Sequence, residues 1–219
     1  MVRIPEDGIL AVYKEAGISS HRVVLEVRHH TGCKVGHAGT LDLYASGVLV
    51  VGVGRPATKK LGLIVGKDKE YITSIRLGCR STSDDREGVK QPVSVTTIPS
   101  EQDVSAALGG FLGVITQRPP AFSALKIAGK PAYKLARAHR PVDLAARQVV
   151  ILQIELLDYQ WPIAKVRLVT GPGVYVRAVA RDLGEVLGTG AYVEELERTR
   201  VGPYTKDQAI HLSDLKISD

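Results

Sequence analysis

The sequence predicts an α+β or mixed α/β fold. Some stretches alternate apolar and polar residues with the period of a strand, others carry apolar residues at helical spacing, and the two kinds follow one another without a regular strand–helix–strand rhythm. The chain has 219 residues, of which 44% are hydrophobic and 24% charged. These values are typical of a globular protein with a core of its own.

The first half of the chain shows three strands and three helices. The expected strands are residues 9–13, 48–53 and 70–77, the last with Tyr71, Thr73, Ile75 and Leu77 on one side. A cap at Ser19 or Ser20 predicts a helix over 21–30 that ends at Gly32. A short helix is expected over 57–65, and Ser100 caps a third one whose apolar face is Val104, Ala107, Leu108 and Phe111.

The second half begins with an unusual stretch. Residues 117–140 are rich in Pro, Lys and Arg and show no clear period, which predicts a basic, partly mobile excursion from the core. Two strands are expected after it, over 147–157 and 163–169. A helix is expected over 174–187, with Val176, Val179, Leu183 and Val186 buried.

The charge balance favours an anionic partner. The net charge is +6 with a pI near 9.3, so nucleic acid is a natural candidate. Aromatic residues make up 5%, too few for a broad stacking platform. No apolar run approaches the ~20 residues that span a bilayer, and Glu6 and Asp7 stand where a signal peptide needs an apolar run. We expect Cys33 and Cys79 to be reduced thiols in the cytoplasm.

An acidic residue among glycines is the first candidate for chemistry. Asp42 ends the stretch 36–42, which carries Gly36 and Gly39, and Gly47 follows before a buried strand. Asp42 is either the capping residue of a turn or an exposed carboxylate that serves as nucleophile or base. Asp84 and Asp85 lie in a polar turn and are expected to be solvated. Without a partner carboxylate, a glycosidase or a carboxylate metal site is disfavoured.

Two further groups of residues could carry chemistry. His29, His30, Cys33 and His37 could supply zinc ligands, but their spacing matches no common zinc site, so we expect no metal. Arg177 and Arg181 lie four residues apart and share a helix face. They form either a solvated basic face or a site that holds a carboxylate or phosphate.

Several motifs follow one another in order over nearly the whole chain. They are Lys14 with 17–20, then 36–42 with 45–47, then 69–71 and 77–78 with Ser81, Ser83, Asp85 and Gly88, then 119–126 with Gly129, Ala132 and Tyr133, then 173–177 and 180–184, and finally Leu196, 198–200 and 202–203. Together they resemble the TruB family of tRNA pseudouridine synthases.

This resemblance implies a pseudouridine-synthase-like α+β fold with a mixed, mainly antiparallel sheet flanked by helices. It implies one catalytic domain over residues 1–219, with a basic thumb-like insertion at about 117–140 and without the C-terminal RNA-binding domain of many members. Asp42 matches the catalytic aspartate, Tyr71 the tyrosine that stacks on the target ring, and Arg177 the arginine that pairs with the aspartate. The expected substrate-binding residues are His37, Tyr175, Leu196, Lys126, Lys130 and Arg137.

The implied activity is isomerisation of uridine 55 in the T-arm loop of tRNA to pseudouridine. The reaction conserves all atoms, so no cofactor or metal is expected. The expected partner is the T-arm stem-loop of tRNA, with no membrane and no obligate protein partner, and the protein is expected to be a cytoplasmic monomer. The alternatives are a guide-RNA-dependent synthase of ribosomal RNA and a non-catalytic module that binds or folds tRNA.

Overall fold

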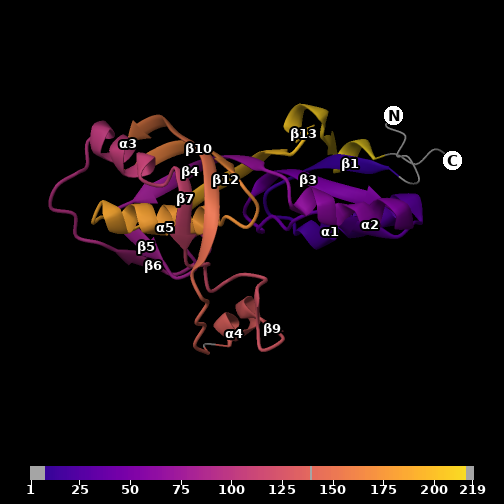
Figure 1. Ribbon diagram of the computed structural model, residues 1–219, viewed down its shortest axis with the longest axis horizontal. Helices are drawn as coiled ribbons and strands as arrows, with labels where there is room; N and C mark the ends of the chain where they lie inside the picture. Colours follow the sequence, from indigo (N-terminus) through magenta and orange to yellow (C-terminus); the bar gives the residue numbers. More distant parts are fainter. Residues whose placement is uncertain (1–7, 139, 216–219) are drawn as a thin grey trace. The chain divides into compact units, whose positions relative to one another are not determined.

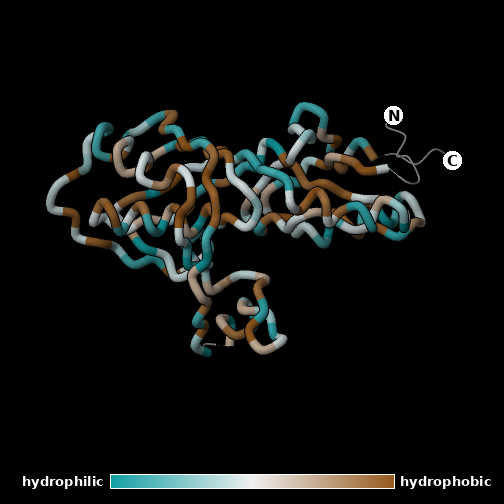
Figure 2. The backbone as a smooth tube through the Cα atoms, in the orientation of Figure 1, coloured by the Kyte–Doolittle hydropathy of each residue, from teal (hydrophilic) through white to brown (hydrophobic). Residues whose placement is uncertain are grey.

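The computed structural model describes residues 8–138 and 140–215 and divides the chain into two compact units. One unit contains residues 1–72 and 196–219, and the other contains residues 73–195. The boundary falls inside two strands, β4 (Lys69–Leu77) and β12 (Ala191–Val201), through which the chain passes from one unit to the other. Figure 2 shows that hydrophobic stretches follow the strands of both units.

The first unit is built on the long apolar strand β3. Its elements are β1 (Ile9–Lys14), α1 (Ser20–Thr31), β2 (Val35–His37), β3 (Ser46–Val53), α2 (Gly54–Val65), β13 (Tyr204–Thr205), β14 (Ile210–His211) and two 3₁₀ turns (Lys206–Gln208 and Leu212–Asp214). In this unit the strands lie in the order β14-β1-β3-β12, with β2 also on β3 and β13 on β12. Both β1 and β2 run antiparallel to β3, whereas β12 runs parallel to it.

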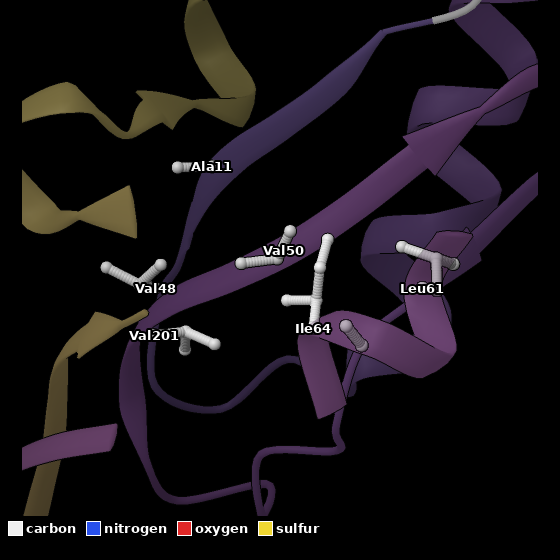
Figure 3. Packing of buried hydrophobic residues seen from close by; sticks show 7 residues of the cluster. Ala11, Val48, Val50, Leu61, Ile64 and Val201 are labelled. Carbon is white, nitrogen blue, oxygen red and sulfur yellow. The ribbon is translucent and has the colours of Figure 1, made fainter. Parts of the chain in front are cut away.

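Successive side chains of β3 reach the two faces of this sheet, and a helix covers each face. Leu49, Val51 and Val53 pack with α1. Val48 and Val50 pack with Leu61 and Ile64 of α2, as Figure 3 shows. A strand buried on both sides reads as an unbroken apolar run, which explains the sequence of β3.

Both ends of α1 follow from local chemistry. The Ser19 hydroxyl accepts a hydrogen bond from the backbone N–H of Arg22 at 3.1 Å, which satisfies one of the free donors of the first turn. Gly32 ends the helix with φ 63°, a conformation that suits glycine. The expected strands and helices of this unit are confirmed, with ends shifted by one to three residues.

The second unit holds the other large group of strands. Here β12 and β4 are followed in order by β11 (Ile163–Thr170), β10 (Arg147–Gln160) and β7 (Gly113–Gln117). β10 runs antiparallel to both β11 and β7. The helix α3 (Glu101–Gly109) packs on β10 and contacts α5 (Val176–Val186), while β5 (Cys79–Ser81) pairs with β6 (Lys90–Pro92) (Figure 1). A full capping box between Ser100 and Asp103 starts α3.

The expected excursion over 117–140 leaves the sheet after β7 and returns to it at β10 (Figure 1). We call it the thumb. The thumb has regular structure although its sequence shows no clear period, because β8 (Lys126–Ile127) pairs with β9 (Lys130–Pro131) and α4 (Ala132–Arg137) follows. Local pairing across a two-residue turn needs no long apolar period, so periodicity does not reveal it. Position 139 lies outside the described residues.

Two expectations for α5 differ from the structure. The helix begins at Val176, two residues later than expected, and Val186 is 66% exposed although the apolar spacing predicts its burial. Val186 is the last residue of the helix, where apolar spacing continues but the packing surface ends. None of the helices in the described part of the chain is long and apolar enough to cross a membrane.

Candidate active site

In the first unit, Asp42 lies in the loop between β2 and β3, which we call the Asp42 loop (residues 38–45). Its neighbours Leu41 and Tyr44 are each 4% exposed, whereas Asp42 itself is half-buried. The backbone N–H of Ala38 donates to the carbonyl of Val50 at 2.8 Å, and that of Ala45 to the carbonyl of Asp42 at 3.2 Å. The first bond therefore anchors the start of the loop to β3, and the second closes a turn that begins at the partly accessible Asp42.

The N-terminal motif also holds this loop. Lys14 is fully buried, and its Nζ donates to the carbonyls of Ile18 at 2.7 Å and Leu43 at 3.3 Å. The N–H of Gly17 also donates to the carbonyl of Leu43, at 2.8 Å. Ser20 exchanges two hydrogen bonds with the backbone of Leu41, at 3.0 and 2.9 Å. Residues 14–20 therefore hold the backbone of the Asp42 loop in place.

Arg198 on β12 fastens the loop as well. Its Nε donates to the carbonyl of Val48 at 2.8 Å and its Nη2 to the carbonyl of Gly39 at 3.0 Å, and the residue is 1% exposed. β12 also pairs with β3 at Gly47, which has φ 111°. A Cβ there would lie 2.2 Å from the carbonyl oxygen of Arg198, so both the conformation and the close approach require glycine.

Tyr71 on β4 is 8% exposed and lies in the same neighbourhood. Burial raises the pKa of its phenol above the ordinary value, and the negative charge of Asp42 acts in the same direction. The positive charge of Arg198 opposes both and lowers the pKa. The structure thus brings Asp42 and Tyr71 together and adds Arg198, which the sequence motifs alone do not mark as a site residue.

The sequence gives no periodic signal for the burial of Arg198. Leu196 is 8% exposed, and Arg198 follows it two residues later, on the same face of the strand. That face also carries Glu194 and Arg200, so Arg198 does not interrupt an apolar pattern.

His37 lies at the end of β2, partly buried. Burial lowers the pKa of its imidazole, and the nearby charges of Arg198 and His21 lower it further. The ring is therefore neutral near pH 7. Its Nδ1 is buried and has no hydrogen-bond partner among the described residues.

In the second unit, Arg177 lies in the first turn of α5 and is 4% exposed. Its Nη1 lies 3.2 Å from Oδ2 of Asp85 and donates to the carbonyl of Ser83, and its Nη2 donates to the carbonyl of Phe122 at 2.9 Å. A solvated basic face at this position is therefore wrong. The expected pairing of Arg177 with Asp42 joins residues of different units and stays a prediction.

The expected solvation of Asp84 and Asp85 is also wrong. Asp85 is 4% exposed, and its Oδ1 accepts hydrogen bonds from the Ser83 hydroxyl and from the N–H of Glu87. Asp84 pairs with Arg181 at 3.1 Å, and burial raises the pKa of its carboxyl. The two arginines of one helix face thus bind the two acids of one turn.

Tyr175 precedes α5 and is held by a buried glutamine. Its N–H donates to Oε1 of Gln117 at 2.9 Å, and its carbonyl accepts from Nε2 of the same side chain at 3.2 Å. The Arg147 guanidinium lies 5.4 Å from the centre of the Tyr175 ring. Tyr175 is half-buried, so a flat surface is held in place with part of it accessible.

The thumb concentrates the excess charge of the protein. It carries six basic residues and no acidic one, namely Arg118, Lys126, Lys130, Lys134, Arg137 and Arg140. All six are exposed. Subtracting them from the chain total leaves 23 basic and 23 acidic residues, so the thumb's excess equals the net charge of +6.

The described residues contain no cluster of three or more His, Cys, Asp or Glu that could hold a metal ion. The rings of His29 and His30 lie 5.7 Å apart on α1, while His37 belongs to β2.

Exhaustive chelation should leave the activity proposed below unchanged, because the donor groups are not gathered into a metal site. The measurement is the single-turnover rate on tRNA of protein treated with a strong chelator, assayed after the chelator has been removed. Untreated protein is the reference. Full inhibition that zinc alone reverses would contradict this expectation.

Comparison with known sequences decides the family. A sequence model described as "TruB family pseudouridylate synthase (N terminal domain)" matches residues 23–176, and one described as "tRNA pseudouridylate synthase B C-terminal domain" matches residues 177–218. The chain belongs to the TruB family. The second match covers α5 and β12, which carry Arg177, Leu196 and Arg198.

Similar proteins agree with this assignment. A protein of Thermobifida fusca named "tRNA pseudouridine synthase B" is 43% identical over 95% of this chain and 74% of its own length. One of the same name from Nocardia farcinica is 45% identical over 94% of this chain and 68% of its own.

The fold expected from the sequence is confirmed by solved structures. The matching chain in a structure described as "Crystal Structure of a Cbf5-Nop10-Gar1 Complex" superposes with a TM-score of 0.75 at 27% identity, over 95% of this chain. One in a "Structure of H/ACA RNP bound to a substrate RNA containing 2'-deoxyuridine" has a TM-score of 0.72 at 25% identity. This chain spans about half the length of those chains, 53% and 52%.

Proposed function

We propose that this TruB-family protein converts uridine 55 in the T-arm loop of tRNA into pseudouridine, with Asp42 as its catalytic group. The observation that carries the proposal is the Asp42 loop itself, whose backbone is held by buried Lys14, Ser20 and Arg198 and whose partly exposed Asp42 lies near Tyr71. The similar proteins of Thermobifida fusca and Nocardia farcinica are named for a tRNA substrate, which supports tRNA as the substrate here.

The chemistry needs an ionised and well-aimed carboxylate. Pseudouridine forms when the N1–C1′ bond breaks, the ring turns, and a C5–C1′ bond forms, with the C5 proton removed at the end. Asp42 can act at C1′, at C6 of the ring, or by removing the C2′ proton. A rigid loop serves each route, because holding the reacting groups in place removes much of the entropic barrier.

The target base must leave its stack first, at a cost of a few kcal/mol. We propose that Tyr71 stacks on the extruded uracil and that Leu196 contacts it, because both are nearly buried apolar surfaces of the first unit. His37, Tyr175 and Arg177 are proposed to serve the same reaction, as their matches to the family motifs imply. A neutral His37 can donate a hydrogen bond to a nucleotide through one ring nitrogen and accept one through the other.

We also propose that the thumb binds the backbone of the T-arm through Lys126, Lys130 and Arg137. RNA stem-loops are recognised mainly through shape and phosphates rather than groove edges. The thumb fits that role because its six Lys and Arg residues are exposed and it carries no acidic residue. We propose a cytoplasmic monomer that needs no protein partner, in accord with the free thiols of Cys33 and Cys79.

The test is incubation of the purified protein with unmodified tRNA, followed by mapping of pseudouridine. The expected product is pseudouridine at position 55 alone, formed without added RNA or protein. A tRNA with cytidine at that position is the matched control and should stay unmodified. No pseudouridine in the first tRNA would contradict the proposal and favour a non-catalytic tRNA-binding module.

A guide-RNA-dependent activity is the second candidate, because chains in two structures described as H/ACA particles share the fold at TM-scores of 0.71 and 0.72. Identity to the proteins named for tRNA is higher, 43% against 25%. Activity on free tRNA decides between the two, since a guide-dependent enzyme would modify its target only when guide RNA is added.

Neutralising the thumb should flatten the salt dependence of tRNA binding. Each phosphate that the protein no longer neutralises lowers the slope of log affinity against log salt by roughly 0.7–0.9. Changing Lys126, Lys130 and Lys134 together to glutamine should therefore lower the slope by up to roughly 2–3. The measurement is a binding titration of one tRNA across a salt series.

Two controls accompany this measurement. Changing the exposed lysines Lys59, Lys60 and Lys67 to glutamine removes the same charge outside the thumb and should leave the slope unchanged. Leu196→Ala should impair turnover without altering the slope, because Leu196 is proposed to touch a base and no phosphate. A thumb variant with the wild-type slope would show that the thumb is only a solvated segment.

A further inference from the structure

Arg198 is a buried cation without a counter-ion among the described residues. It is 1% exposed, and its Nε and Nη2 are bound by two backbone carbonyls rather than by a carboxylate. Burying a charge is expensive unless it is hydrogen-bonded, and an apolar residue here would leave these two carbonyls without their donors. The arginine at this position is therefore explained by the two backbone segments that it binds.

The two carbonyls lie on either side of Asp42 in the sequence. Gly39 lies three residues before Asp42, and Val48 lies on β3 after the end of the loop. The planar guanidinium spans both with two donors in fixed geometry, which a lysine cannot do. Arg198 therefore joins the two ends of the loop, and the pairing of its own backbone with Gly47 fixes the position from which its side chain starts.

The same guanidinium acts on the other groups of the site. Its positive charge opposes the raised pKa of Tyr71 and lowers the pKa of His37. It also contributes, after burial, to lowering the pKa of Lys69 to about 8. One buried side chain thus binds the loop of the proposed catalytic acid and lies within electrostatic reach of the proposed stacking tyrosine.

We propose that Arg198 is the positioning residue of the reaction, which holds the Asp42 loop in one fixed arrangement without contacting the substrate. The proposal rests on the function proposed above. It assigns Arg198 no part in RNA binding, because a residue that is 1% exposed cannot reach a phosphate. Its loss should slow the chemical step and leave tRNA affinity unchanged.

The experiment compares two variants. Arg198→Met removes the charge, whereas Arg198→Lys keeps the charge but loses the two donors in fixed geometry. Single-turnover rates on tRNA should fall by about 100-fold for the methionine variant, the usual effect of a small misplacement of reacting groups. The lysine variant should recover only part of this loss. The tRNA dissociation constant should match the wild type in both. The matched control is Arg200→Met on the same strand, whose partner is Asp68 in a partly exposed ion pair, and it should keep the wild-type rate.

A second readout does not depend on activity. Amide hydrogen exchange in peptides that cover residues 38–45 should accelerate in the lysine variant, because the anchor at Gly39 is weakened, while peptides of α1 should exchange as in the wild type. Exchange that accelerates throughout the first unit would indicate general destabilisation and overturn the positioning role. So would wild-type rates in both variants. If the methionine variant does not fold, the lysine variant carries the test.

The wild-type protein in the same assay separates the two proposals. If it makes no pseudouridine in tRNA, the proposed function is wrong, whatever the exchange data show. If it is active and the Arg198 variants are equally active, only the positioning role is wrong.

Discussion

Asp42→Asn should abolish pseudouridine formation while leaving tRNA binding intact. The amide has the shape of the carboxylate but can act neither as a nucleophile nor as a base, and the described residues offer no second acid in the Asp42 loop. Loss of an obligatory catalytic group commonly lowers the rate on the order of 10⁴-fold or more. The measurement is the single-turnover rate with enzyme in excess over tRNA, together with the dissociation constant.

The matched control is Asp207→Asn, which makes the same change at an exposed position of the same unit. It should retain the wild-type rate. The fold should survive in both variants, because backbone groups of Gly39, Leu41, Leu43 and Val48, which neither substitution changes, anchor the loop. An Asp42→Asn protein that keeps a tenth of the wild-type rate would show that Asp42 is not the catalytic acid.

Asp85→Asn should lower the free energy of unfolding by about 3–5 kcal/mol, because it breaks a buried ion pair. Asp85 and Arg177 each have side chains 5% exposed, so water cannot replace the missing carboxylate. In either orientation the new amide sets its N–H groups against donors, which are the Arg177 guanidinium at the position of Oδ2 or the Glu87 N–H and the Ser83 hydroxyl at the position of Oδ1. The measurement is denaturant unfolding at fixed pH.

Glu185→Gln is the matched control, since it removes one carboxylate from the exposed pair with Arg80, at 53% and 46% exposure. Exposed pairs contribute only about 0–1 kcal/mol, so its unfolding curve should lie close to the wild type. Similar losses in the two variants would mean that the Asp85–Arg177 pair is no more stabilising than a surface pair.

Local chemistry accounts for the elements that the sequence predicts correctly. Ser19 and Gly32 bound α1 because a hydroxyl cap and a left-handed glycine act within a few residues of the helix ends. Strand β4 is recognisable from the alternation that buries Tyr71 and Leu77 on one side. The short strands β2 and β14 are not, since two or three residues carry no measurable period and pair only when β3 and β1 are in place.

The candidate site also has features that the sequence predicts and features that only the structure shows. Motifs and composition point to Asp42, Tyr71 and the basic thumb, and the structure places Asp42 and Tyr71 within electrostatic reach of each other. The burial of Asp85 and the hold of Arg198 on the Asp42 loop do not follow from the sequence. Asp85 binds Arg177, 92 positions away, and Arg198 binds Val48, 150 positions away.

The sequence by itself determined the α+β class, most helix and strand positions, the family motifs and the location of the charge excess. These depend on interactions along the chain or on composition, which the order of residues expresses directly. Only the tertiary structure decided which charged residues are buried and what they hold. The free energy of a buried charge is set by the few donors and acceptors that folding brings within about 3 Å, and residues far apart in the chain supply them.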